Sequence, residues 1–210
     1  MPTALEICNR ALNFLGEPVL TNLSDTGVAA DALTNRFVDV FHECQDEENW
    51  YFFTARAVLT ENTSVTQYTP FDYVYDLPSD VYSVIGTDPR VDYVIMPVSG
   101  SMYLFCDYSA DTTNNYPRVV YQVDVLSLDD NDDPVISSTY TSLIPAWFSR
   151  VVAAKLAMDS CIQITDKAEL KQDMRSEYYL ALKRARQFNE MYTPGASADP
   201  STWGDIPVGT

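Results

Sequence analysis

The chain has 210 residues, of which 46% are hydrophobic, so it can form a folded core and is not a wholly disordered protein. Its 30 acidic and 13 basic residues give a formal net charge of −17, which argues against proteins that hold nucleic acid by neutralising phosphates. No stretch approaches the roughly 18–20 consecutive apolar residues of a membrane-spanning helix. The opening residues lack the basic and apolar regions of a signal peptide, so we expect synthesis in a cytoplasm.

The charge is unevenly distributed along the chain. Residues 1–149 contain 22 of the acidic residues but only five of the basic ones, and every lysine lies at or after Lys155. The simpler interpretation is a solvated acidic surface beside a pair of helices with i,i+4 ion pairs. The alternative is that the acidic surface faces a polyanion that it must repel.

Two helices are predicted before residue 50. Thr3 and Glu6 have the spacing of a capping box, and Gly16 and Pro18 end the first helix. Ser24 or Asp25 is the expected cap of a second helix that runs to about Glu48. Both helices have apolar residues at helical spacing: Leu5, Cys8, Leu12 and Leu15 in the first, and Ala29, Leu33, Phe37, Val40 and Cys44 in the second. Acidic residues 46–48 lie at the unfavourable, C-terminal end of the helix dipole.

From Trp50 onward, apolar residues recur at every second position, which is typical of strands. Turn-forming residues separate the apolar stretches, and ten of the fourteen tyrosines lie between Tyr68 and Tyr140. Six or so short strands at this spacing predict a small antiparallel sandwich or barrel.

The helical period then returns for two further helices. Pro145 suits the first turn of the first of these, and Thr165 or Asp166 is the expected cap of the second, with Glu169 completing a possible capping box after Asp166. Their apolar stripes are Trp147, Val151, Ala154, Met158 and Cys161, followed by Leu170, Met174, Tyr178, Ala181, Ala185 and Phe188.

The predicted fold class is therefore α+β: a four-helix bundle with an antiparallel β-sandwich or barrel domain inserted between helices 2 and 3. Helices at both ends of the chain must bury their single apolar stripes against each other. The expected domains are residues 1–50 and 142–192 for the bundle and residues 51–141 for the β domain. In residues 193–210 the apolar residues follow no regular spacing, and this segment is expected to form an extended C-terminal arm.

The sequence predicts no catalytic, cofactor-binding or metal-binding residues. His42 is the only histidine, and no nucleophile motif accompanies it. Seven glycines form no phosphate-binding loop. Cys8, Cys44, Cys106 and Cys161 are too far apart in sequence for a typical metal site and are interpreted as reduced, mostly buried side chains.

The acidic run at residues 129–133 invites comparison with a calcium-binding loop. Its sixth position is Pro134 and its twelfth is Tyr140, where a calcium loop needs glycine and glutamate. A solvated acidic loop is the preferred interpretation, with adventitious binding of a divalent cation as the alternative.

Several motifs, in order, resemble the tail tubular protein A family, the head-to-tail adaptors of short-tailed bacteriophages. They are ALNFLGEP at residues 11–18, RFVDVF at residues 36–41, Trp50 with Phe52 and Phe53, RAVL at residues 56–59, LPSDV at residues 77–81, the hairpin around Gly100 leading to Met102 and Tyr103, and the stretch from IPAW at residues 144–147 to Tyr178. The resemblance spans about residues 3–192. The chain departs from the family pattern in the acidic insert before the third helix and in the long tail.

The resemblance implies a structural protein of the virion that is made in the host bacterial cytoplasm and is not an enzyme. Its copies would form a ring, a homo-oligomer of commonly twelve subunits, between the portal protein and the tail nozzle, or tubular protein B. Genomic DNA would pass through the central channel during ejection without specific binding, and acidic or neutral walls suit that passage.

Two other functions remain open at this stage. A virion-associated polysaccharide hydrolase would use a pair of carboxylates in the β domain, but acidic residues are so abundant there that some pair is always available. A carbohydrate-binding module would use the tyrosines of the β domain, although tyrosines at alternating strand positions more often pack against neighbouring strands.

Overall fold

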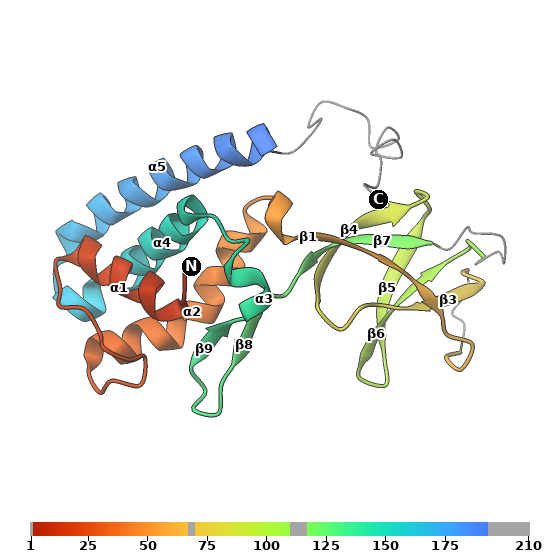
Figure 1. Ribbon diagram of the computed structural model, residues 1–210, viewed down its shortest axis with the longest axis horizontal. Coiled ribbons are helices and arrows are strands. Elements are labelled where there is room, and N and C mark those ends of the chain that lie inside the picture. Colours follow the sequence, from red (N-terminus) through yellow and green to blue (C-terminus); the bar gives the residue numbers. More distant parts are fainter. Residues whose placement is uncertain (1, 67–69, 110–116, 193–210) are drawn as a thin grey trace. The chain divides into compact units, whose positions relative to one another are not determined.

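The computed structural model describes residues 2–66, 70–109 and 117–192. The fold is mixed α+β, as predicted, with helices and antiparallel sheets. The described chain divides into two compact units: a helical unit of residues 2–51 and 126–192, and a β unit within residues 52–125 (Figure 1). The expected arm at residues 193–210 lies outside the described residues.

The helical unit is built from both ends of the chain. Its helices are α1 (Ala4–Leu15), α2 (Val28–Asp46), the single turn α3 (Ser138–Thr141), α4 (Ala146–Thr165) and α5 (Ala168–Tyr192). Among the described residues, no helix combines the length and hydropathy needed to cross a membrane.

One predicted helix cap is confirmed and two are wrong. The hydroxyl of Thr3 accepts from the Glu6 backbone N–H, and the Glu6 carboxylate accepts from the Thr3 N–H, which makes the expected capping box of α1. The helix ends at Gly16 in the left-handed conformation (φ 73°) that glycine adopts without steric cost.

The α2 helix starts after Gly27 rather than after Ser24 or Asp25. The Asp25 carboxylate instead accepts from the backbone N–H groups of Thr21 and Asn22, so it closes the preceding turn. Asp166 is the left-handed C-cap of α4 (φ 54°) and donates its N–H to Ile162, so it ends one helix instead of starting the next.

The α4 helix is the centre of the helical unit and contacts α1, α2 and α5. A single apolar stripe was expected, but residues 151–154 are four consecutive buried residues, and Ser149 and Ser160 are buried as well. Alanines at positions 153, 154 and 157 let neighbouring helices approach closely. This helix is therefore covered around most of its circumference.

A chain of aromatic rings joins the elements of this core. Phe148 of α4 lies 5.5 Å from Phe41 of α2 and 5.4 Å from Trp50, measured between ring centroids, and both contacts are edge-to-face. Trp50 also contacts Trp147, which stacks on Phe188 of α5 at 6.1 Å. Edge-to-face and offset contacts of this kind stabilise beyond the area they bury.

The second domain boundary lies at residues 125/126 rather than at 141/142. The strands β8 (Leu126–Leu128) and β9 (Pro134–Ile136) pair with each other in a separate two-stranded sheet. Pro134 and Ile136 are buried, and β9 contacts α1 and α2. This hairpin, which the sequence analysis placed in the β domain, therefore belongs to the helical unit.

The β unit contains two antiparallel sheets. One has the order β1-β7-β4, formed by β1 (Thr54–Val58), β7 (Arg118–Val123) and β4 (Val81–Asp88). The other has the order β2-β3-β6-β5, formed by β2 (Thr60–Glu61), β3 (Tyr73–Asp76), β6 (Ser101–Cys106) and β5 (Tyr93–Val98). A 3₁₀ turn, η1 (Tyr51–Phe53), precedes β1.

The inner strands of the two sheets contribute most of the core of the β unit. Val119, Tyr121 and Val123 of β7 are buried, and so are Leu104 and Phe105 of β6. The β5–β6 hairpin pairs Val98 with Ser101 and turns through Ser99 (φ 51°) and Gly100 (φ 89°). Positive φ at both turn residues matches the twist of the flanking strands and explains the glycine.

Candidate assembly surfaces and their anchoring contacts

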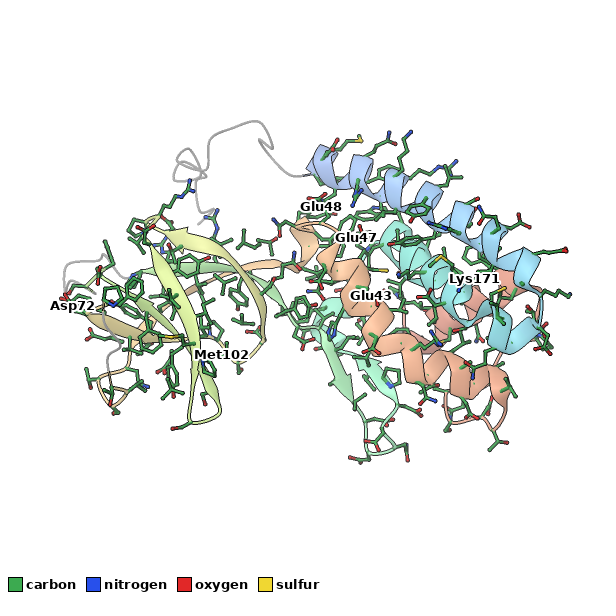
Figure 2. All side chains as sticks on the ribbon, turned by 180° about the vertical axis from the view of Figure 1, so that it is seen from behind. Glu43, Glu47, Glu48, Asp72, Met102 and Lys171 are labelled. Atoms are coloured by element: carbon green, nitrogen blue, oxygen red, sulfur yellow. The ribbon has the colours of Figure 1, made fainter. Side chains whose placement is uncertain are left out.

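The acidic end of α2 is held by basic residues from other helices. Figure 2 labels Glu43, Glu47 and Glu48 along the C-terminal part of this helix. The Arg186 Nη2 atom of α5 donates to the Glu47 Oε2 at 2.8 Å and to the Glu47 backbone carbonyl at 3.1 Å. A cation that binds both a terminal carbonyl and the neighbouring carboxylate offsets the unfavourable charge at this end of the helix dipole.

A second basic residue, Lys155 of α4, connects the same part of α2 to α5. Its Nζ lies 2.8 Å from the Glu43 carboxylate and 3.8 Å from that of Asp159, and 5.4 Å from the centroid of the Tyr178 ring. Desolvation lowers the pKa of Lys155, but the hydrogen bond that its ammonium donates to Glu43 and the charge of Asp159 outweigh this effect, so the pKa is raised. The lysine therefore stays charged between three helices.

The hydroxyl of Tyr178 completes this network by donating to the Glu47 Oε1 at 2.9 Å. Burial and the adjacent carboxylate raise the pKa of Tyr178 well above the usual value for tyrosine. The phenol thus remains a donor, and α5 is fixed on α2 at this point.

The segment that leaves α2 is clamped by a buried asparagine of α5. The Asn189 side chain donates to the Asn49 carbonyl at 3.1 Å and accepts from the Tyr51 N–H at 3.0 Å. The Trp50 indole N–H donates to the Cys44 carbonyl at 2.9 Å, and the Tyr51 ring lies 5.4 Å from that of Tyr192. The contacts of Asn189 and Tyr192 join residues about 140 positions apart, and together with the Trp50–Cys44 hydrogen bond they fix the last residues before the β unit.

The sequence analysis did not identify Arg186 or Asn189 as important. The one available signal was the acidic run at the end of α2, which conflicts with the helix dipole and therefore calls for a basic partner. Which of the eight basic residues between positions 150 and 190 supplies it depends on helix packing, and the sequence does not specify that packing.

Asp129 closes the loop between β8 and β9. Its carboxylate accepts from the backbone N–H of Asn131 at 2.8 Å and of Asp133 at 3.0 Å, and these two bonds lower its pKa. Within the described ranges, no group of three or more His, Cys, Asp or Glu residues could hold a metal ion. These hydrogen bonds account for the position of the Asp129 side chain in the turn between β8 and β9.

The other residues weighed for chemistry have structural surroundings. His42 is half-buried on α2. In the β unit, the Asp76 carboxylate accepts from the Asn62 amide at 2.8 Å and the Asp80 carboxylate from the Tyr121 hydroxyl at 3.1 Å. The Asp107 carboxylate accepts from a backbone N–H at 3.1 Å. These three carboxylates therefore stabilise turns and strand ends of their own unit.

The four cysteines are free and buried, as expected for small apolar side chains. Burial raises the pKa of the Cys8 thiol to about 12 and that of the Cys44 thiol still further. At neutral pH these two side chains are protonated, which does not suit a nucleophile.

A hollow of about 300 Å³ lies where α1 meets the start of α4. Arg10 lines it and donates from Nη1 to the Ala146 carbonyl at 3.2 Å, and the Ser149 hydroxyl donates to the Pro145 carbonyl at 3.3 Å. Its polar groups thus bind the protein's own backbone and hold the start of α4 against α1.

Two helix faces of the helical unit are exposed and differ in charge. The α2 outer face consists of Val28, Asp31, Asn35, Asp39 and Asp46, all exposed and all opposite the buried side of this helix. The α5 outer face consists of Ser176, Leu180, Lys183, Arg184 and Gln187, also all exposed. They are the candidate assembly surfaces.

No protein-family model matches the chain, and no curated protein is similar enough to be counted as a relative.

Proposed function

We propose that this chain is a structural protein of a phage virion, a ring-forming head-to-tail adaptor between the portal vertex and the tail nozzle. Twelve copies are expected by resemblance, and the ring would form part of the channel through which DNA is ejected. In this role the protein would act through its shape and its contacts, and no step of chemistry is required of it.

The observation that best supports the proposal is the order of the two units along the chain. Both ends of the chain build the helical unit, and the β unit leaves it after α2 and returns before α4. The motifs that resemble the adaptor family occur in this order. We infer that α1, α2, α4 and α5 are a four-helix bundle and that the two sheets of the β unit are a sandwich or barrel.

The anchoring contacts also suit a subunit that bears mechanical load. The clamp of Asn189 on residues 49–51 fixes the point at which the chain leaves the helical unit, and the Arg186–Glu47 contact fixes α5 to the end of α2. A force on the β unit would therefore reach a well-packed part of the helical unit and not the end of a frayed helix.

The distribution of charge is consistent with a DNA channel. Acidic residues predominate in residues 1–149, and a wall lined by them would repel the phosphates of passing DNA instead of retaining them. We propose that part of this acidic surface lines the channel.

The proposal is tested by negative-stain imaging of the purified chain, alone and mixed with the portal ring of a short-tailed phage. We expect closed rings with a central opening, in at least the second sample. Single particles in both samples, together with turnover of a polysaccharide that is lost on changing one Asp or Glu of the β unit, would favour the hydrolase instead. Glycan binding by a stable monomer would favour the carbohydrate-binding module.

A further inference from the structure

We propose that neighbouring copies of this chain contact each other through the α5 outer face of one copy and the α2 outer face of the next. The inference rests on the proposed ring and specifies its lateral contact. The partner on both faces is a second copy of the chain, and the argument depends on charge complementarity and on where the two faces lie.

The α2 outer face is acidic along its length. Asp39 and Asp46 are seven residues apart, so they lie nearly in line, about 10 Å apart along the helix. Asp31 lies eight residues before Asp39, about 12 Å along the helix and about 80° round it, on the same exposed side. Arg36, the only lysine or arginine of α2, lies at the edge of this face, three residues before Asp39 and about 60° round the helix from it, so the face keeps a net negative charge beside one arginine. The exposed side chain of Val28 (59%) begins the face.

The α5 outer face is basic in its central part. Lys183 and Arg184 are exposed and form no ion pair with the described carboxylates. Leu180, 44% exposed, lies one turn before them. Glu169 and Asp173 lie on the same side of α5 more than two turns before Lys183, and the exposed Glu190 lies on that side about two turns after it, so the positive region is limited to about residues 180–187.

The other basic residues of α4 and α5 are less suited to an external partner. Arg150 binds Glu177, and Lys155 and Arg186 bind the acidic residues of α2 within the same chain. Arg175 lies over the Tyr179 ring at 5.8 Å. Lys183 and Arg184 are therefore the adjacent pair of cations that remains available for a second copy.

The two faces lie on different sides of the helical unit. The α4 helix contacts both α2 and α5 and lies between them in Figure 1. A contact between two different, complementary faces is heterologous, so each copy can bind one neighbour on each side, and the series closes into a ring when the rotation permits. A two-fold contact of the α2 face with itself would place aspartates against aspartates and is disfavoured.

The test measures self-association by sedimentation velocity at low salt and ring closure by negative-stain imaging. The variants are K183E/R184E on α5 and D31K/D39K on α2, each alone and the two mixed. Each alone should associate at least about tenfold more weakly than the wild type, because like charges then face each other. In the mixture, the α5 face that K183E/R184E makes acidic can bind the α2 face that D31K/D39K makes basic. The two unchanged faces are complementary as well, so the mixture should recover association.

The control is K167E/K171E, which changes the net charge equally. Lys167 lies just before α5 and Lys171 in its first turns, both outside the α5 outer face (Lys171 is labelled in Figure 2). It should associate like the wild type. Circular dichroism establishes that each variant is folded. The neutral pairs K183Q/R184Q and D31N/D39N provide smaller changes, which should weaken association by about threefold.

The outcomes separate this inference from the proposed function. Rings that persist in either charge-reversed variant, or a mixture that does not recover, would overturn this contact and leave the ring intact. Open oligomers that depend on these charges but never close into a ring would support the contact and contradict the adaptor. A wild-type chain that stays monomeric at its highest soluble concentration and also when mixed with the portal ring would overturn both the adaptor and this contact.

Discussion

Arg186 joins two parts of the helical unit that are far apart in sequence, the end of α2 and the last part of α5. The end of α2 combines three acidic residues with the negative end of a helix dipole, and Arg186 lies against both. Because its guanidinium is half-exposed, the ion pair itself is worth little, whereas the hydrogen bond to the terminal carbonyl and the lost packing add to the cost of removing it.

We therefore predict that Arg186→Ala lowers the free energy of unfolding by about 1–2 kcal/mol. Chemical denaturation at neutral pH and low salt measures it. Lys171→Ala, at an exposed position of the same helix outside the α5 outer face, is the control and should change the free energy by less than about 0.5 kcal/mol. Equal effects of the two substitutions would show that the end of α2 does not depend on Arg186.

The buried thiols lead to a second prediction, on the dependence of stability on pH. In the folded chain the pKa of Cys8 and that of Cys44 are raised by burial above the ordinary value of 9.0, so the folded state keeps protons that the unfolded state releases at alkaline pH. The free energy of unfolding should therefore be constant up to about pH 8 and fall above pH 9.

Between pH 8 and pH 10 we expect a loss of about 2 kcal/mol, measured by denaturant unfolding under reducing conditions. The variant C8A/C44A should be less stable at neutral pH, because it leaves cavities, but should lose much of this pH dependence. If the free energy of unfolding of the variant depends on pH as that of the wild type does, titratable groups other than these two thiols cause the dependence.

At the scale of elements, the β8–β9 hairpin determines where the helical unit ends. It pairs only with itself, and β9 packs against α1 and α2 through Ile136. Apolar residues alternate along this hairpin as they do in strands, which predicts a β domain that continues to residue 141. The spacing of apolar residues predicts whether an element is a helix or a strand, but it does not predict which surface that element covers.

Two deletions distinguish these boundaries. Replacing residues 52–125 with a short Gly-Ser linker should leave a helical protein with a cooperative thermal transition. Replacing residues 51–141 should give a protein less stable by at least about 2 kcal/mol, because Ile136 no longer covers α1 and α2. Thermal unfolding followed by circular dichroism provides the comparison, and equal stability of the two proteins would contradict the boundary at residue 125.

The positions of the long elements were predictable from residue patterns. Thr3 with Glu6 and the glycine at position 16 mark both ends of α1, and helical spacing locates α2, α4 and α5, because amphipathic helices must bury one face. The hairpin at Gly100 was predictable for a similar reason, since few residues other than glycine suit its turn.

Other features depend on contacts between distant residues and were not predictable. The start of α2 at Gly27 depends on Asp25 being used by the preceding turn, and Asp166 ends α4 instead of starting α5. The Asn189 clamp joins segments far apart in sequence, and any of several polar residues in α5 fitted the pattern equally well.

At the scale of the whole molecule, the net charge of −17 limits the partners of the chain. Counterion release rewards basic surfaces that meet DNA, and this chain offers its basic residues mainly on α4 and α5, where several bind carboxylates of the same protein. DNA should therefore pass this protein without being retained by it.

We predict that the purified chain does not retard duplex DNA in a gel-shift assay at about 50 mM salt, where phosphate contacts are strong. The K183E/R184E variant, which removes two exposed cations, should behave in the same way. Retardation that weakens steeply with added salt would contradict an acidic or neutral channel wall.

The most direct test of the ring is a cryo-EM reconstruction of the assembled chain bound to a portal ring. The account predicts a closed ring of identical copies, joined laterally through the helical units, around a channel whose wall is mainly acidic or neutral. Single copies scattered on the portal, or a closed ring with a mainly basic wall, would contradict it.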